Sequence, residues 1–448
     1  MGEEIVCGIM KIIHKVQGER RFFRVCLKWL AKHNPELVKR NLKYIPEYGR
    51  YDDLYTFVGT PLEKDALQVI KDQLELDVAC KTPSLLAKWL KSENTSSAES
   101  RKLGNITRQF LGMTHKQYRK TLAVLRTRIN VLEKLMSENR WSEIEYDKIP
   151  SKAGLKYKNA FARRDIERVK AGVQTYEEFA KDETKTVNAG TLYPYEVVDK
   201  ATKVWTRRGW YDYILPPMDD TNRLMVNKYW DNLTDYFNGA TFNGIAVVDT
   251  SGSMTGNSAS CPINVAISLG MYCAEKAKGP FAGHYISFAS RPQLIAVEGV
   301  DFCDKVKRIY QTNLCDNTNL EAVFDLILNN AINYHMSQDD LPQNVIVITD
   351  MEFDSACEFG YWGSNRGKDK LTLMEGIEKK FEAAGYKLPH LIFWNVDARQ
   401  NNIPMLGNGP ISYVSGMSPA IFETIMSGKT GYELMMEKLD SPRYSAIG

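Results

Sequence analysis

The chain has 448 residues, of which 44% are hydrophobic and 25% are charged. This is enough apolar material to bury a sizeable core, and it excludes disorder over the whole length. The formal net charge is only +3, but it is divided unevenly, because residues 1–240 sum to +10 and residues 241–448 sum to −7. The first part is therefore the candidate for a polyanionic partner.

The sequence predicts neither a signal peptide nor a membrane-spanning segment. It contains no apolar run of about 18 residues or more, and the N-terminus MGEEIVCGIMKIIHK lacks the pattern of a signal peptide. The eight cysteines are scattered without a C-x-x-C pair, which favours reduced thiols over a disulfide scaffold or a zinc site. We expect a cytoplasmic protein without a membrane segment.

From Arg21 to about residue 235, apolar residues recur at helical spacing and strand-like alternation is nearly absent. Prolines separate amphipathic helices that are predicted over residues 22–32, 35–45, 62–78 and 84–91. Short helices with one apolar stripe suit stacked helical pairs better than an isolated bundle. Residues 1–238 are therefore predicted to form an α-helical array of HEAT-like repeats.

The pattern changes at Thr241. Apolar strands are predicted over residues 242–249, 284–289, 294–298, 344–350, 390–398 and 411–416. Helices are predicted between them over residues 262–277, 302–311, 319–334 and 371–385. Strands that are apolar throughout and alternate with helices predict a doubly wound parallel sheet covered on both faces, over residues 239–448.

Oxygen-bearing side chains follow the predicted strands. In an open parallel sheet, ligands bind beyond the carboxyl ends of the strands, and hard divalent cations prefer oxygen ligands. The sequence therefore predicts one divalent cation, Mg²⁺ or alternatively Mn²⁺ or Ca²⁺, at the following residues: Asp249, Ser251, Ser253, Thr318 and Asp350. The alternative interpretation is an ordinary polar strand-to-helix turn with an N-cap.

The pattern D-x-S-x-S, then a threonine before a later helix, then T-D after a strand, resembles the von Willebrand factor A (vWA) domain. The resemblance implies a metal-ion-dependent adhesion site (MIDAS) in which Ser251, Ser253 and Thr318 hold the metal. The two aspartates would act directly or through water, and a protein partner would complete the metal shell. Met351 stands where the family usually has glycine, which alters the rim of the site.

Catalysis is not predicted. The nucleophile motif G-x-S-x-G is absent, and no histidine lies in a motif that would pair it with Ser251 or Ser253. A nuclease would need clustered carboxylates for two metals, and the motifs supply only Asp249 and Asp350. We therefore expect a protein that is not an enzyme.

Basic side chains are concentrated in residues 101–170, which contain 18 Lys and Arg against 7 Asp and Glu. Cations neutralise phosphates, and interleaved aromatic rings can stack on unpaired bases. The predicted RNA-binding residues are Lys116, Arg119, Lys120, Arg126, Arg128, Lys156, Lys158, Arg163 and Arg164. The alternative is a solvated helix surface, since basic helix faces are common.

A helical array followed by a vWA-type domain resembles the TROVE/Ro family of RNA-binding proteins. Three stretches support this, because they resemble the Ro-related proteins of uncharacterised function: QGERRFFRVCLKWLA, NLKYIPEYGRYDDLYTFVG and SEIEYDKIPSKAGLKYKNAFARRD. It implies a ring of helical repeats and a ribonucleoprotein with non-coding or misfolded RNA, structured on the outer surface and single-stranded in the central hole. The alternative function is a vWA adaptor that presents a protein to an AAA+ ATPase without nucleic acid.

Overall fold

A computed structural model describes residues 20–447 except 130, 208–209, 238, 240–241, 256–260, 313–317, 351–372, 398–410, 420, 423–424, 426–432, 434–435 and 438. The chain divides into two compact units, one of residues 1–144 with 428–448 and one of residues 145–427. The predicted domain boundary at 238/239 falls inside the second unit and stays a prediction.

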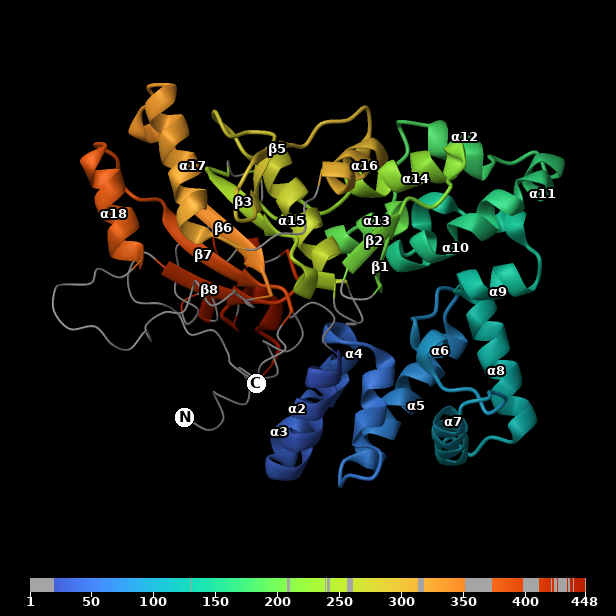
Figure 1. Cartoon of the computed structure of the whole chain (residues 1–448). Coiled ribbons are helices and arrows are strands. Elements are labelled where there is room, and N and C mark those ends of the chain that lie inside the picture. Colours follow the sequence, from blue (N-terminus) through green and yellow to red (C-terminus); the bar gives the residue numbers. More distant parts are fainter. Residues whose placement is uncertain are drawn as a thin grey trace. The chain divides into compact units, whose positions relative to one another are not determined.

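The first unit is helical (Figure 1). Its elements are α2 (Arg20–His33), α3 (Pro35–Asn41), η1 (Leu42–Tyr44), α4 (Ile45–Tyr48), η2 (Tyr51–Phe57), α5 (Glu63–Ala79), α6 (Leu86–Trp89), α7 (Ala98–Phe110), α8 (His115–Arg128), α9 (Leu132–Ser137), η3 (Trp141–Glu143) and η8 (Pro442–Tyr444). Leucines spaced three or four residues apart, such as Leu27 and Leu30 on α2, build one buried core with α5 and α8. The helical prediction for this region is confirmed, whereas repeats and a ring stay predictions.

Local sequence sets the bounds of these helices. The Ser97 side chain caps α7 by accepting a hydrogen bond from the backbone of Ser100, and Thr114 forms a capping box with Gln117 at the start of α8. The helix predicted over residues 84–91 is reduced to the single turn of α6. The following Ser, Asn and Thr residues favour turns, which explains why this helix stops early.

The second unit begins with helices and continues into a sheet. Its elements are η4 (Tyr146–Lys148), α10 (Ser151–Arg163), α11 (Asp165–Lys170), α12 (Tyr176–Lys181), α13 (Pro194–Ala201), β1 (Lys203–Arg207), β2 (Trp210–Ile214), α14 (Asp220–Asp231), β3 (Gly244–Asp249), η5 (Gly252–Thr255), α15 (Pro262–Lys276), β4 (His284–Phe288), β5 (Leu294–Ala296), α16 (Phe302–Thr312), α17 (Leu320–Asn333), η6 (Gln338–Asp340), β6 (Asn344–Thr349), α18 (Leu373–Ala383), β7 (His390–Asn395) and β8 (Ile411–Ser415).

The large sheet has the strand order β5-β4-β3-β6-β7-β8. All neighbours are parallel except β4 and β5, so the prediction of a wholly parallel sheet is wrong at this edge. Only five residues join β4 to β5, and so short a connection makes a hairpin because a parallel pair needs a long crossover. The chain first adds strands on one side of β3 and then on the other, so a topological switch point lies between β3 and β6.

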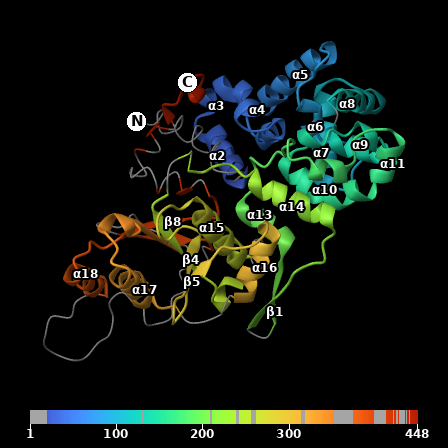
Figure 2. The ribbon, with the colours of Figure 1, turned by 90° about the horizontal axis from the view of Figure 1, so that it is seen from above.

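Helices cover both faces of this sheet. Alternate residues such as Val247 and Val347 pack with α17 and α18, which lie side by side in Figures 1 and 2. On the opposite face, α15 approaches β3 so closely that a Cβ added to Gly270 would overlap the side chain of Val248. The predicted doubly wound arrangement is confirmed in this respect.

The antiparallel hairpin of β1 and β2 interrupts the half that was predicted to be helical throughout. The prediction that strands are nearly absent there is wrong at this place. Residues 203–214 are rich in aromatic and β-branched residues around an Arg-Gly pair, a composition that favours a hairpin.

Candidate functional site

Two aspartates flank the switch point of the sheet. Asp249 is the last residue of β3, and Asp350 directly follows β6, its parallel neighbour. The Asp249 carboxylate accepts hydrogen bonds from the Thr349 hydroxyl at 2.6 Å and from the Ser251 backbone N–H at 2.9 Å. The parallel register therefore brings both carboxylates to the edge where such sheets bind ligands.

Two of the predicted hydroxyl ligands lie next to these carboxylates. The Oγ atoms of Ser251 and Ser253 are 3.0 Å apart, and both side chains are only half-buried. The turn of η5 holds them at the end of β3. They are placed where they could contact both a cation and a ligand from solvent.

Thr318, the fifth predicted ligand, directly precedes Asn319, the N-cap of α17. Because α17 leads into β6, its N-terminus belongs to the edge where the parallel strands end. The Thr318 Oγ1 atom is buried and has no hydrogen-bond partner among the described residues. A buried hydroxyl in this state costs free energy unless a ligand satisfies it.

Electrostatics at Asp249 favour a cation. The pKa of Asp249 is raised to about 6, chiefly by burial and to a smaller extent by the nearby charge of Asp350, against the lowering effect of the hydrogen bonds from Thr349 and Ser251. Two buried carboxylates that disfavour each other's ionisation would be stabilised by a divalent ion.

The donor set fits a hard cation. It consists of carboxylate and hydroxyl oxygens, the atoms that Mg²⁺ and Ca²⁺ prefer. No group of three or more His, Cys, Asp or Glu side chains in the described part of the chain could hold a metal. A cation at this edge would therefore depend on the hydroxyls and on water, and the metal assignment stays a prediction.

The predicted RNA-binding residues of α8 fall into two groups. Lys116, Arg119 and Lys120 are exposed on one face of the helix and have no carboxylate partner among the described residues. Arg126 instead donates to the carbonyls of Ala87 and Leu90, at 2.8 and 2.9 Å, and to the Ser92 hydroxyl at 3.0 Å.

Internal contacts also hold the last basic residue of α8, because Arg128 donates to the carbonyls of Val78 and Cys80. Burial lowers the pKa of Arg126. A phosphate would therefore have to compete with internal acceptors for Arg126 and Arg128, whereas Lys116 and Lys120 are free of such competition in the described structure.

On α10, Lys156 and Arg163 are exposed, and the Arg163 Nε donates to the backbone carbonyl of its own helix at Asn159. Arg164, just after the helix, pairs with Glu167 at 2.6 Å. Lys158 is half-buried against Asn222, and burial lowers its pKa. The two basic clusters belong to different units, because α10 is part of the second unit and α8 of the first.

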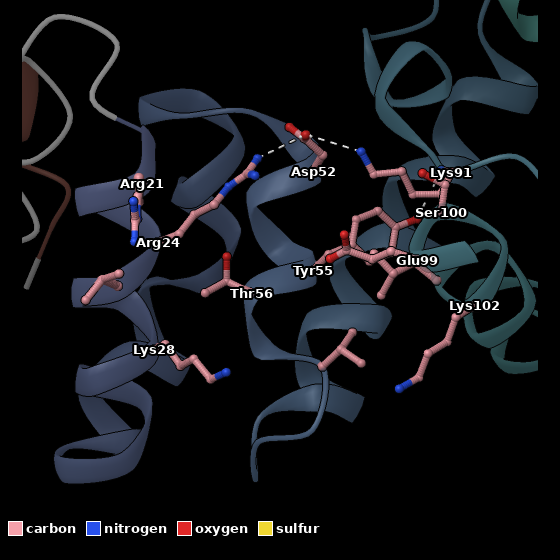
Figure 3. Close-up of a pocket in the computed structure, with 13 residues that line it drawn as sticks. Arg21, Arg24, Lys28, Asp52, Tyr55, Thr56, Lys91, Glu99, Ser100 and Lys102 are labelled. Carbon is pink, nitrogen blue, oxygen red and sulfur yellow. Dashed lines mark hydrogen bonds and ion pairs between the residues drawn. The ribbon is translucent and has the colours of Figure 1, made fainter. Parts of the chain in front are cut away.

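A basic groove in the first unit was not predicted. It has a volume of about 640 Å³, and Figure 3 shows the side chains that line it. It is lined by Arg21, Arg24, Val25, Lys28, Asp52, Tyr55, Thr56, Val58, Lys91, Glu99, Ser100, Lys102 and Leu103. The signal in the sequence was the spacing of Arg21, Arg24 and Lys28, which places three cations on one helix face.

Asp52 lies at one end of this groove and forms ion pairs with cations on both of its sides. Its Oδ2 atom accepts from Arg24 at 3.0 Å and from Lys91 at 3.4 Å, while Arg50 binds its other oxygen at 2.8 Å. Burial raises the pKa of Asp52, but the charges of Arg50, Lys91 and Arg24 more than offset this effect, so the pKa lies below its ordinary value. The carboxylate is therefore ionised and holds the cations in place.

Comparisons with known proteins divide the chain at about residue 240, whereas the two compact units meet at residues 144 and 145. The family model of a domain of unknown function, DUF2828, matches residues 76–239, and that of a second one, DUF7788, matches residues 243–443. The second match contains all five predicted metal ligands. Among the described residues, no helix is long and apolar enough to cross a membrane.

One similar protein is the uncharacterized protein L728 of Acanthamoeba polyphaga mimivirus, which is 32% identical over 361 residues. The match covers 77% of this chain and 58% of that protein, so the chain spans less than two thirds of its relative's length. A structural comparison also found the Ro (RSR) protein of Deinococcus radiodurans, with a TM-score of 0.46 and 14% identity, covering 98% of this chain and 90% of that one.

Proposed function

We propose that this protein binds RNA through its basic helical surfaces, without catalysing a reaction, and that its sheet carries a divalent cation. One observation carries the RNA part. Residues 100–132 contain eight basic and no acidic side chains, and the three cations on the outer face of α8 lack carboxylate partners in the described structure. No neighbouring carboxylate in the described structure competes for these cations, so they are available to phosphates.

Exposed cations on α10 extend this proposal to the second unit. RNA that is partly single-stranded, such as a non-coding or misfolded RNA, would offer both phosphates and unpaired bases to these surfaces. The proposed assembly is a ribonucleoprotein in which helical repeats close into a ring.

Salt dependence tests RNA binding. For single strands, log K should fall against log salt with a slope of about 0.7 per phosphate contact. Charge reversal in the double variant Arg163→Glu with Arg164→Glu should lower this slope, if these residues touch phosphates. The control is a double charge reversal at two exposed lysines outside the predicted set, Lys64→Glu with Lys81→Glu.

The metal part of the proposal rests on the buried, unsatisfied hydroxyl of Thr318 and the paired carboxylates at the switch point. Mg²⁺ would be held by the hydroxyl and carboxylate oxygens, and would supply a Lewis-acidic position for a ligand carboxylate. Ser251 and Ser253 would orient it from the half-exposed side, where a protein partner could reach.

Mn²⁺ binding to the purified chain, followed by electron paramagnetic resonance, tests the metal part. Asp249→Ala should abolish this binding, and RNA affinity should stay within a few-fold of the wild type because the cations belong to other elements. The alternative adaptor function predicts a different result. Asp249→Ala would then lose a metal-dependent protein partner, and neither the wild type nor the variant would bind RNA. RNA affinity that collapses in Asp249→Ala would refute the separation of the two sites.

A further inference from the structure

The groove of the first unit has cations on two facing walls. Arg21, Arg24 and Lys28 lie along α2 on one side, and Lys91 and Lys102 lie on the other (Figure 3). Five cationic side chains against the carboxylates of Asp52 and Glu99 leave the lining with a net charge of +3. The groove is therefore attractive to anions along its length.

The cations in the groove differ in how they are engaged. Arg24 and Lys91 are fixed by Asp52, so they supply placed charges without freedom to move. Arg21, Lys28 and Lys102 have no ion-pair partner among the described residues, and all three are exposed. In Figure 3 the amino groups of Lys28 and Lys102 face each other across the end of the groove that lies away from Asp52.

An aromatic side chain continues the surface of α2. Trp29 follows Lys28, is 51% exposed, and stacks on His33 with ring centroids 4.2 Å apart. Val25, one helical turn earlier, lines the groove and is 59% exposed. An apolar strip thus runs beside the cations, which suits unpaired bases that stack on exposed rings.

We propose that this groove holds the phosphate backbone of a single RNA strand, with its bases directed toward Val25 and Trp29. The assignment rests on the proposed RNA-binding function and names the site for it. A volume of about 640 Å³ lies in the range of small-ligand pockets, so the groove has room for a short stretch of one strand. Cations on both walls contact phosphates from two sides, whereas a flat basic patch contacts them from one.

The test uses the full chain and fluorescence anisotropy with a labelled single-stranded RNA of mixed sequence, over a series of salt concentrations. The double variant Lys28→Gln with Lys102→Gln removes one free cation from each wall. The matched control, Lys64→Gln with Lys81→Gln, removes the same charge from exposed lysines that do not line the groove. Thermal unfolding of each variant checks that the fold is retained.

The groove variant should reduce the slope of log K against log salt by about 1.4, at about 0.7 per phosphate contact, and lower the affinity roughly ten-fold near physiological salt. The control should keep the wild-type slope. Glu99→Gln, which removes an exposed carboxylate from the lining, should strengthen binding a few-fold.

Several outcomes would overturn the assignment. If the wild type binds RNA and the groove variant behaves as the control does, the groove is not the site, although the proposed function stands. If the wild type binds no RNA in low salt, the proposed function itself fails. Preference for duplex RNA, or displacement of the strand by a free mononucleotide at equal concentration, would assign the groove to another ligand.

Discussion

Two threonines near the sheet site differ in how their hydroxyls are satisfied. The Thr349 hydroxyl donates to Asp249 at 2.6 Å, whereas the buried Thr318 Oγ1 has no hydrogen-bond partner among the described residues. Replacing a satisfied donor to a charged group costs stability, but replacing an unsatisfied buried hydroxyl by a methyl group does not. The two residues should therefore respond oppositely to the same substitution.

Thr318→Val should raise the free energy of unfolding of the metal-free protein by about 1 kcal/mol, and Thr349→Val should lower it by about 2 kcal/mol. Urea denaturation in a chelating buffer measures both. If Thr318 is a ligand, Thr318→Val should also weaken Mn²⁺ binding. A destabilised Thr318→Val variant with unchanged metal affinity would show that the hydroxyl has a structural partner.

The second residue-scale prediction concerns Asp52 in the groove. Its folded-state pKa lies below its ordinary value of 3.8, because Arg50, Lys91 and Arg24 favour the ionised form. Below its ordinary pKa the unfolded chain binds more protons than the folded one, so the contribution of Asp52 to stability is full above about pH 4 and is lost as the pH falls through the lower, folded-state pKa.

Asp52→Asn should therefore destabilise the protein at neutral pH, by about 2 kcal/mol from the lost charge-assisted hydrogen bonds, and should flatten the acid limb of the stability curve. Denaturant midpoints measured from neutral pH down to acid pH give both effects. Asp72→Asn is the control, since Asp72 is exposed and bonds only to Gln68 in the described structure. An acid limb as steep in Asp52→Asn as in the wild type would contradict the assignment.

At the scale of elements, the spacing between α15 and β3 makes a glycine necessary. A Cβ at Gly270 would overlap the buried, β-branched side chain of Val248, which cannot easily move. At Gly376 in α18, such an atom would have no neighbour within 4 Å among the described residues. Both glycines lie within helices of the same unit. Comparing alanine substitutions at the two positions therefore distinguishes the effect of packing from that of helix propensity.

Gly376→Ala should stabilise the second unit by up to about 1 kcal/mol through helix propensity. Gly270→Ala should destabilise it by roughly 1–3 kcal/mol despite the same gain, because overpacking outweighs propensity. Differential scanning calorimetry of the two variants measures the difference. Equal, stabilising effects would show that α15 lies farther from the sheet than described.

The limits of the sequence predictions are clearest among these elements. Continuous apolar runs such as residues 244–249 predicted strands correctly, because burial on both faces leaves no other composition. The direction of β5 could not be read from its three residues, since parallel and antiparallel edge strands share the same pattern. The basic groove was missed because a count of charges over residues 101–170 does not show which helix face a cation occupies, and α2 lies outside that window.

In the candidate sites too, some features could be predicted from the sequence and others could not. The positions of Asp249, Ser251 and Asp350 directly after apolar strands were enough to place them at one sheet edge, because the carboxyl ends of parallel strands lie at the same edge. The internal contacts of Arg126 could not be foreseen, because its acceptors, the carbonyls of Ala87 and Leu90, lie more than thirty residues away in the sequence. Long-range acceptors of this kind leave no local pattern.

On the scale of the whole molecule, the first unit contains segments from both ends of the described chain. Tyr444 is 1% exposed and packs against Tyr48, with ring centroids 5.3 Å apart, and Ile447 joins the same cluster. Tyr444→Ala should lower the stability of the first unit by about 3 kcal/mol, as is usual for large buried rings.

The proposed metal binding should survive this substitution, because the predicted ligands belong to residues 249–350 of the second unit. Denaturation followed by tryptophan fluorescence, with Mn²⁺ binding measured in parallel, distinguishes the units. Tyr334→Ala is the control, since this ring is 72% exposed in the second unit. Loss of both properties in Tyr444→Ala would show that the units do not fold independently.

The discontinuous first unit has a consequence for synthesis on the ribosome. The ring of Tyr48 is made early, but its partner Tyr444 emerges only after the 300 residues from Glu145 onward have been translated. At 5–20 residues per second this interval is about 15–60 s, which is long compared with the folding of a single domain. The main core of the first unit consists of residues 23–125 and can form during that time, so the part left open to solvent until the C-terminal segment arrives is the small aromatic surface of Tyr44 and Tyr48.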